Sequence, residues 1–431
     1  NWAAAKGYES YDKLALGLGY DYQFSKRWMI KTSFFSNLKT AYEPRPFDIL
    51  DEKTSTAGFR SNVNYKDKLF SKDFEMSFGT ELLAENDRYS LFKNLYQSQP
   101  GQGSIKGDEF SAFKQKRNYA NYFLQMELWI SKKLHLETGL AFNTTKYSLE
   151  DVFNNKVSNQ KEPYTFGSVW TPRIGLSYKI KNGKNIFASV SKGFSVPSVA
   201  ETLTPDGQIN TNLKPEIGWN YEIGFKGNWL ATKLYTEVAL YSTQIKNLLV
   251  ARRTAEDQFV GINAGSSSHS GLEFLVNYRI IESNKLQINS YFSGAVNNFK
   301  FKEFLDGETD YSGNQITGVP EKQINFGLDI TTQSGFGVNT SFRTMSKIPL
   351  NDSNTKYIKQ YSLLDIKTSY TFKLIKILKT ELNAGINNAL NTKYSANILP
   401  NATGFGTVAP RYFYPGNPVN FYGGFSVSYL F

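Results

Sequence analysis

The stretch "KLALGLGYDYQF" (residues 13–24) alternates two kinds of side chain along its whole length. One set consists of leucines, tyrosines and a phenylalanine, and the other contains small or polar residues such as Gly17, Gly19 and Asp21. A period of two places the two sets on opposite faces of a β-strand. The stretch therefore predicts a strand with one apolar face and one polar face.

The same alternation recurs along the chain, and no long segment shows a helical period of 3.6. The alternating segments run for about 10–14 residues, whereas strands of soluble sandwiches are nearer 5–6. A soluble β-sandwich also alternates, but aromatic residues near strand ends favour the girdles of a membrane barrel. The fold class predicted is all-β, a transmembrane antiparallel β-barrel. Further examples are "RIGLSYKI" (173–180), "GLEFLVNYRI" (271–280), "LLDIKTSYTF" (363–372) and "FYGGFSVSYLF" (421–431).

The connections between these segments are expected to alternate between short and long, as in outer-membrane barrels with tight periplasmic turns and long outer loops. The count is about 17 strands. In hydrocarbon an open sheet edge is too costly, so further strands are expected in the working molecule. Short links are expected near 25–26, 69–71, 131–133, 181–184, 229–231, 282–284, 333–335 and 374–377, and long links near 39–55, 87–116, 148–168, 194–217, 245–267, 298–317, 346–359 and 389–418.

Composition excludes several classes of function. The 431 residues contain no cysteine, which removes thiol chemistry and cysteine-based metal sites, and only two histidines. The net charge is +11, but lysine and arginine are scattered along the chain, which argues against a nucleic-acid patch. The first residues, "NWAAAKGYES", lack an initiator methionine and a signal-like segment, so we expect an internal start.

Five elements, in order, resemble the TonB-dependent receptor family. "SKGFSVPSVAETL" (191–203) is similar to its S-x-G-F-R-A-P-S motif, although Ser195 and Val196 replace the usual Arg-Ala. "INNALNTKYS" (386–395) is similar to V-x-N-L-F-D-x-x-Y, with Ala389 and Asn391 in place of the usual Phe and Asp. The other three are "NTNLKPEIGWNYEIGFKG" (210–227), "INAGSSSHSGLEF" (262–274) and the closing "PRYFYPGNPVNFYGGFSVSYLF" (410–431).

The resemblance implies that residues 1–431 are the barrel domain of such a receptor, with about 17 of 22 strands. The plug domain, the TonB box and the first strands would lie outside this chain. The implied location is the outer membrane of a Gram-negative bacterium. The implied partners are the TonB complex acting through the plug, the plug itself, lipopolysaccharide and membrane lipid, the barrel-assembly machinery that recognises the terminal Phe431, and a surface lipoprotein. No nucleic acid and no catalytic activity are expected.

The outer loops carry aromatic and cationic side chains, which suit a planar or anionic chelate through stacking and charge attraction. The cargo predicted is a ferric siderophore, carried as a ligand, with no resident cofactor and no metal site. Binding of lipopolysaccharide phosphates, or simple packing, is the alternative role for any one of these residues. The candidate ligand-binding residues are Arg252, Arg253, Tyr394, Arg411, Tyr412 and Tyr414.

Other functions stay open at this point. A related importer would carry vitamin B12, another metal chelate or an oligosaccharide. A protein of another class would be a passive pore, a scaffold in an outer-membrane complex, or an outer-membrane hydrolase using His135 or His269. The acidic loop with Asp306, Glu308 and Asp310 lacks the EF-hand pattern, so a solvated loop is preferred to a calcium site.

Overall fold

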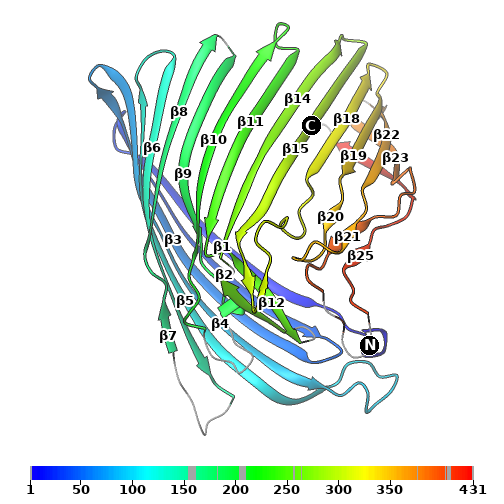
Figure 1. Ribbon diagram of the computed structural model, residues 1–431. Coiled ribbons are helices and arrows are strands. Elements are labelled where there is room, and N and C mark those ends of the chain that lie inside the picture. Colours follow the sequence, from blue (N-terminus) through cyan, green and yellow to red (C-terminus); the bar gives the residue numbers. More distant parts are fainter. Residues whose placement is uncertain are drawn as a thin grey trace.

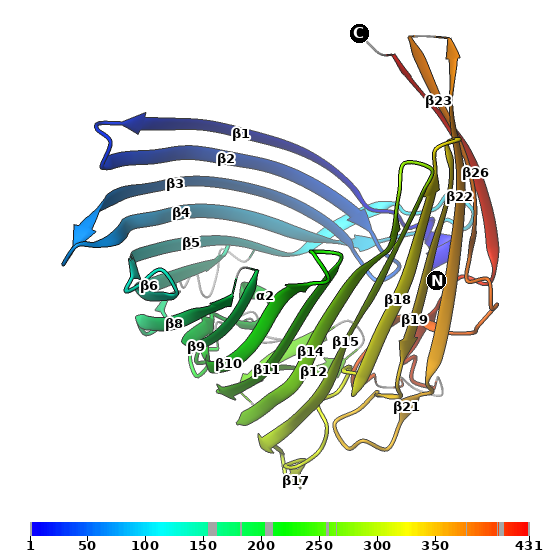
Figure 2. The same cartoon turned by 90° about the horizontal axis from the view of Figure 1, so that it is seen from above.

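The computed structural model describes residues 2–153, 162–181, 183–202, 210–255, 258–263, 265–375, 377–402, 404 and 409–429. The chain forms one large antiparallel sheet that curves into an open trough (Figures 1 and 2). The sheet has 18 strands, one of which, β7 (Glu162–Thr165), is a four-residue strand beside β6. The remaining seventeen are long strands, which confirms the predicted count. No helix among the described residues is long and apolar enough to cross a membrane.

The long strands pair with their neighbours in chain order, and β1 and β26 are the two edges. They are β1 (Ser10–Gln23), β2 (Trp28–Pro44), β3 (Ile49–Leu69), β4 (Lys72–Asn94), β5 (Lys106–Trp129), β6 (Leu134–Asp151), β8 (Val169–Lys181), β9 (Lys184–Ser195), β10 (Glu216–Trp229), β11 (Leu234–Lys246), β14 (Ser266–Glu282), β15 (Leu286–Glu303), β18 (Lys322–Thr332), β19 (Phe336–Met345), β22 (Tyr361–Ile375), β23 (Leu378–Asn387) and β26 (Asn420–Tyr429).

The long connections contain small elements of their own. Among the described residues these are four two-stranded hairpins and one single-turn helix, and a second single-turn helix precedes β1. The hairpins are β12 (Leu249–Ala255) with β13 (Gln258–Asn263), β16 (Leu305–Asp306) with β17 (Thr309–Asp310), β20 (Ile348–Pro349) with β21 (Tyr357–Ile358), and β24 (Ser395–Ile398) with β25 (Phe413–Pro415), and the helices are α1 (Trp2–Ala5) and α2 (Val199–Thr202).

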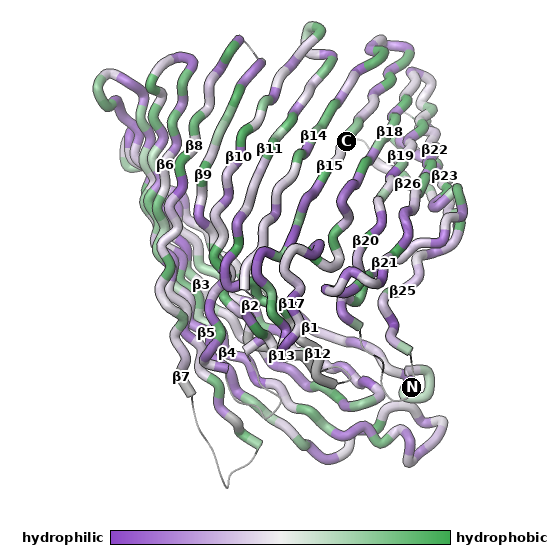
Figure 3. The backbone as a smooth tube through the Cα atoms, in the orientation of Figure 1, coloured by the Kyte–Doolittle hydropathy of each residue, from purple (hydrophilic) through white to green (hydrophobic). Residues whose placement is uncertain are grey.

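Strand pairing places apolar residues of neighbouring strands opposite one another, so that they form one continuous set on the same face of the sheet. For example, Phe425 lies opposite Leu382, and Leu382 lies opposite Tyr370 on the next strand. Side chains diverge on the convex face of a curved sheet, and this set is the more exposed one, with Phe425 at 77% and Leu176 at 44%. Apolar and polar residues alternate along the strands (Figure 3). The prediction that the apolar set faces outward is confirmed.

The inner face has a second regularity, in which aromatic rings lie over glycines of the neighbouring strand. Phe35 lies opposite Gly58, and a Cβ built on Gly58 would fall 2.0 Å from the ring. Phe123 covers Gly79 in the same way, at 2.5 Å. Glycine therefore lets these rings lie flat against the sheet, which keeps them out of the lumen. Further pairs are Phe187 with Gly224, Tyr241 with Gly271, Tyr291 with Gly327, and Tyr422 with Gly385.

Two of the predicted long links are wrong in extent. Most of 39–55 is strand, since β2 runs to Pro44 and β3 begins at Ile49. Likewise β4 and β5 occupy most of 87–116. These strands reach 21–24 residues rather than the expected 10–14. A barrel strand needs about 9–11 residues to cross a bilayer, so the predicted crossing would use roughly half of each of these strands.

Candidate functional site at the mouth formed by the long connections

The short turns lie at one end of the sheet and the long connections at the other (Figure 1). The long connections near residues 196–215, 247–265, 304–321, 346–360 and 388–419 are joined to one another by contacts. We call these five connections the collar. The candidate ligand residues lie on the collar, so the contacts within the collar determine which of their side chains are exposed.

The first contacts join connection 196–215 to the sheet beside it. The Tyr147 hydroxyl donates to the backbone carbonyl of Pro197 at 3.0 Å, and Tyr164 donates to that of Leu213 at 2.8 Å. Tyr147 is 4% exposed, and burial raises the pKa of its hydroxyl. A buried neutral phenol of this kind acts as a fixed hydrogen-bond donor.

The same connection then joins the β12–β13 hairpin. The backbone N–H of Lys214 donates to the Asn263 side-chain oxygen at 2.8 Å. The N–H of Leu249 donates to the Glu216 carboxylate at 2.7 Å. Burial raises the pKa of Glu216, although the Leu249 N–H opposes this shift. The hairpin is therefore held at its base by side-chain bonds to the start of β10.

An apolar cluster links the hairpin to connection 304–321. Phe301 and Phe304 are almost fully buried, with ring centroids 4.6 Å apart, and Leu248 and Val250 pack against them. Burying two aromatic side chains supplies several kcal/mol of hydrophobic free energy, at about 25 cal/mol per Å². Through Leu248 and Val250 this cluster anchors the base of the hairpin.

Polar bonds continue the collar to its last two connections. Gln315 N–H donates to the Asn354 side-chain oxygen at 2.7 Å, and Asn314 donates to the carbonyl of Asp352 at 2.8 Å. Asn401 donates to the Asp352 carboxylate at 2.8 Å and accepts from its backbone N–H. Asp352 thus lies where three connections meet.

These asparagines were not among the candidates predicted from the sequence, although asparagine in a long connection is itself a signal of a defined turn. Asn388, at a φ of 49°, is 3% exposed and bonds to Thr392 and Asn417. Asparagine tolerates the left-handed conformation better than other non-glycine residues, so asparagine in a long loop indicates a built turn. Other collar residues with this conformation are Asn247, Asn354, Asn391 and Asn401.

The predicted ligand residues fall into two groups on the collar. Arg252 and Arg253 lie on β12, opposite Val260 and Phe259 of β13, and their side chains are outside the described part. The other four lie on connection 388–419. The two groups are not in direct contact in the series of contacts described above, because that series passes from the β12–β13 hairpin through connections 304–321 and 346–360 before it reaches connection 388–419.

Within the second group the environments differ. Tyr412 packs against the cluster of Ile348, Leu350 and Ile358. Tyr394 lies 5.7 Å from the Tyr361 ring and accepts a bond from Gly416 N–H at its carbonyl. Arg411 and Tyr414 are exposed, Tyr414 at 56%. Ligand binding stays a prediction for all six residues, and among the four candidates with described side chains Arg411 and Tyr414 are the exposed ones.

The remaining sequence candidates are placed as follows. Phe431 lies outside the described residues. His135 faces the lumen near a short turn, 3.3 Å from the Glu127 carboxylate, and His269 stacks on Phe299 at 4.6 Å. Among the described residues, no group of three or more His, Cys, Asp or Glu could hold a metal ion, and this includes the acidic loop at 305–310.

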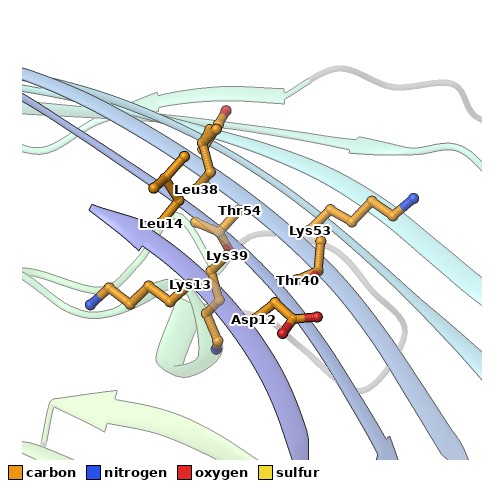
Figure 4. A pocket seen from close by; sticks show the side chains of 9 residues that line it. Asp12, Lys13, Leu14, Leu38, Lys39, Thr40, Lys53 and Thr54 are labelled. Carbon is orange, nitrogen blue, oxygen red and sulfur yellow. The ribbon is translucent and has the colours of Figure 1, made fainter. Parts of the chain in front are cut away.

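A hollow of about 530 Å³ lies at the edge strand β1 (Figure 4). Its lining comes from β1, β2 and β3, and Lys13 and Lys53 point in opposite directions. It takes residues from both faces because β1 has a strand neighbour on one side only. Such a hollow at a sheet edge is not a ligand pocket of the collar.

The geometry therefore defines a curved antiparallel sheet with an apolar convex face and a built collar at one end. Residues 1–389 match the family model described as "TonB dependent receptor-like, beta-barrel". The chain belongs to this family.

Curated relatives of this chain include receptors named for siderophores. Over 276 residues the chain is 23% identical to the ferric-pyoverdine 358 receptor of Pseudomonas putida, covering 56% of this chain and 32% of that protein. Over 399 residues it is 22% identical to the probable TonB-dependent siderophore receptor PiuA of Acinetobacter baumannii, covering 89% of this chain and 49% of that protein. The chain thus spans a third to a half of the length of these curated relatives.

A solved structure supports the fold. The siderophore receptor PiuA from Acinetobacter baumannii aligns with a TM-score of 0.75 at 14% identity, covering 99% of this chain and 65% of that one. At this identity the likeness establishes the fold and does not transfer residue roles.

Proposed function

We propose that the complete protein is an outer-membrane TonB-dependent receptor that imports a ferric siderophore. One relative is named as a ferric-pyoverdine receptor and another as a probable TonB-dependent siderophore receptor. Membership of the family makes TonB and a plug domain the expected partners. The apolar convex face is the feature of this chain that supports a membrane location, because the strands of a membrane barrel turn a band of apolar side chains outward to the lipid.

In this proposal the collar receives the ligand and the lumen passes it on. A preformed collar lowers the entropy cost of binding, because few loop residues need to be ordered on contact. Arg411 and Tyr414 supply a cation and an exposed ring for an anionic, planar chelate. Transport is noncovalent, so no catalytic residue is assigned. Energy would come from the TonB complex acting on the plug.

The experiment is uptake of radiolabelled iron by a strain that carries the complete gene as its only siderophore receptor. Ferric pyoverdine, ferric catecholates and ferric citrate are supplied one at a time, with a TonB-deficient strain as control. Uptake of at least one chelate that disappears without TonB supports the proposal. Uptake that is equal without TonB would indicate a passive pore, and uptake of vitamin B12 alone would redirect the cargo.

A variant pair tests the ligand residues. The double variant Arg411→Ala with Tyr414→Ala is compared with Lys359→Ala, which removes an exposed cation of connection 346–360 that is not a candidate ligand residue. We expect the double variant to bind the transported chelate about tenfold more weakly and the Lys359→Ala control to bind it unchanged. Equal affinity in all variants would remove Arg411 and Tyr414 from the site.

A further inference from the structure

The short turns gather the excess positive charge of the chain at one end of the sheet (Figure 1). We call these eight turns, with the strand ends that flank them, the short-turn end. It contains 15 lysine and arginine residues and four acidic residues. Its net charge of +11 equals that of the whole chain, so the remaining residues carry no net charge. The short-turn end consists of residues 23–29, 66–75, 128–135, 179–181, 183–185, 227–235, 279–287, 331–337, 372–375 and 377–380.

Ion pairs among the described residues involve three of these cations. Asp73, the fourth acid of this end, forms no such pair, and the nearest acids of the lumen, Asp21, Glu127 and Glu381, form none with these cations. The three pairs are Arg27 with Asp67, Lys66 with Glu75 and Arg279 with Glu282. The cations without an ion pair to the described residues are Lys26, Lys68, Lys72, Lys132, Lys133, Lys179, Lys181, Lys184, Lys233, Lys285, Lys373 and Lys379.

The cations without ion pairs are spread along the whole end of the sheet. They occur at seven of the eight short turns, and the turn between β18 and β19 is the exception. The long strands pair in chain order, so successive turns are neighbours in space. A protein partner would contact one sector of such an end, whereas a lipid leaflet meets every strand. The distribution therefore fits a leaflet better than a docked protein.

Large apolar side chains stand beside these lysines at the tips of the turns. Phe70, between Lys68 and Lys72, is 88% exposed, and Leu230, before Lys233, is 61% exposed. Both have a φ of 50°, so the backbone turns tightly at these side chains. Leu374 and Ile375 repeat the pattern next to Lys373. Apolar side chains mixed with lysine are typical of segments at a membrane interface, where apolar groups meet acyl chains and cations meet head groups.

Outward aromatic rings place the cations at the depth of the head groups. The Lys184 ammonium lies 3.4 Å from the centroid of the Trp229 ring, and Trp28 packs on Tyr65 at 4.4 Å. Aromatic rings of this kind mark the boundary of the hydrocarbon in membrane barrels. Lys26 lies two residues from Trp28. At about 3.3 Å per residue and a tilt near 45°, its Cα is roughly 5 Å beyond that boundary.

We propose that the short-turn end binds anionic phospholipid in the inner leaflet of the outer membrane. Short turns of an outer-membrane barrel lie on the periplasmic side, so the inner leaflet is the one they meet. Lysines close to a membrane surface are attracted to anionic lipid, and phosphate oxygens accept charge-assisted hydrogen bonds from them. This inference rests on the proposed outer-membrane location but not on the cargo.

The test measures binding of phosphatidylglycerol and phosphatidylcholine to the complete receptor in detergent, by native mass spectrometry. Each lipid carries one phosphate, but phosphatidylglycerol alone has a net negative charge. The short-turn variant combines Lys26→Gln, Lys132→Gln, Lys133→Gln and Lys233→Gln. The matched control combines Lys300→Gln, Lys302→Gln, Lys356→Gln and Lys359→Gln, which removes the same charge from exposed lysines at the collar end. We expect the short-turn variant to bind phosphatidylglycerol about tenfold more weakly and the control to bind it unchanged.

Three other results would overturn the proposal. They are equal phosphatidylglycerol binding by both variants, equally tight binding of the two lipids by the unchanged receptor, and displacement of phosphatidylglycerol by millimolar inorganic phosphate. The first would leave the charge for an acidic periplasmic protein, and the last would indicate a site for the free anion. If the fourfold variant fails to assemble, Lys132→Gln with Lys133→Gln, against Lys356→Gln with Lys359→Gln, gives the same reading with a smaller shift. Siderophore uptake is not part of this readout, so failure here leaves the transport proposal untouched.

Discussion

The two faces of β3–β6 use the same residue types in opposite ways. On the inner face arginine and glutamate are paired across strands, as in Arg117 with Glu85 and Arg60 with Glu81. On the outer face Lys53, Arg88 and Lys114 stand opposite one another and form no ion pair with the described residues. The inner pairs balance charge within the chain, and on the outer face the Lys106–Asp51 pair does the same, whereas the row of Lys53, Arg88 and Lys114 has no such pair among the described residues. Alternate residues of a strand point to opposite faces, so a residue's position along the strand decides whether its charge faces the lumen or the outside of the sheet.

The largest effect is expected where the outer face meets hydrocarbon. Leu124 faces outward near the middle of the apolar band, and Gln125 faces the lumen beside it. Leu124→Arg should destabilise the folded receptor by about 2–4 kcal/mol, because a guanidinium would face lipid. Gln125→Arg should cost far less, since Glu127 and Glu137 lie within reach of that position. Urea unfolding of the complete receptor in lipid vesicles measures both, and equal costs would show that the two faces are not distinct.

A smaller effect separates the two kinds of cation on β5. Arg117→Met removes the partner of the half-buried Glu85 carboxylate and should lower the free energy of unfolding by about 1 kcal/mol. Lys116→Met removes an unpaired outward charge and should cost nothing in detergent. The same unfolding assay compares the two variants. A larger loss of unfolding free energy for Lys116→Met than for Arg117→Met would contradict this difference between the inward and outward cations.

The smallest effect is local and concerns the collar. Burial raises the pKa of Glu216 above its ordinary 4.5. The Glu216 carboxyl therefore keeps its proton to a higher pH when the hairpin is docked against it than when the hairpin is undocked. Docking of β12–β13 should therefore weaken as pH rises from 4.5 through the raised pKa. Glu216→Gln keeps an oxygen for the Leu249 N–H and should remove this dependence. Hydrogen exchange at the Leu249 amide, corrected for intrinsic rates, tests it; identical pH profiles in both proteins would contradict the assignment.

The sequence predicted the membrane-spanning part of the fold well because lipid imposes a strict pattern there. Strand count, the order of short and long connections, and the outward direction of Phe425 and Leu176 all follow from a period of two. The pattern fades where β3–β5 leave the bilayer, since neither face needs apolar residues in water. Residues such as Lys53 and Arg88 therefore looked like loop, and the strands were predicted too short.

The candidate site was harder to predict for a related reason. Aromatic and cationic residues in the collar suggested ligand contacts, yet Tyr412 packs on Ile348 and Leu350. A loop can bury an aromatic ring against another loop that lies far away in sequence, and single-chain patterns do not report such contacts. Asn388 and Asn354, which shape the turns, carry no strong composition bias and were found only through their backbone conformation.

The most direct test of this account is spin-label accessibility along β5 in the complete receptor reconstituted in lipid. The chain contains no cysteine, so single cysteines at positions 119–126 can be labelled without background. We expect oxygen accessibility to peak at 122, 124 and 126, and the aqueous reagent to peak at the positions between them. A profile without alternation, or one with the two reagents exchanged, would contradict an apolar face in lipid and every inference built on it.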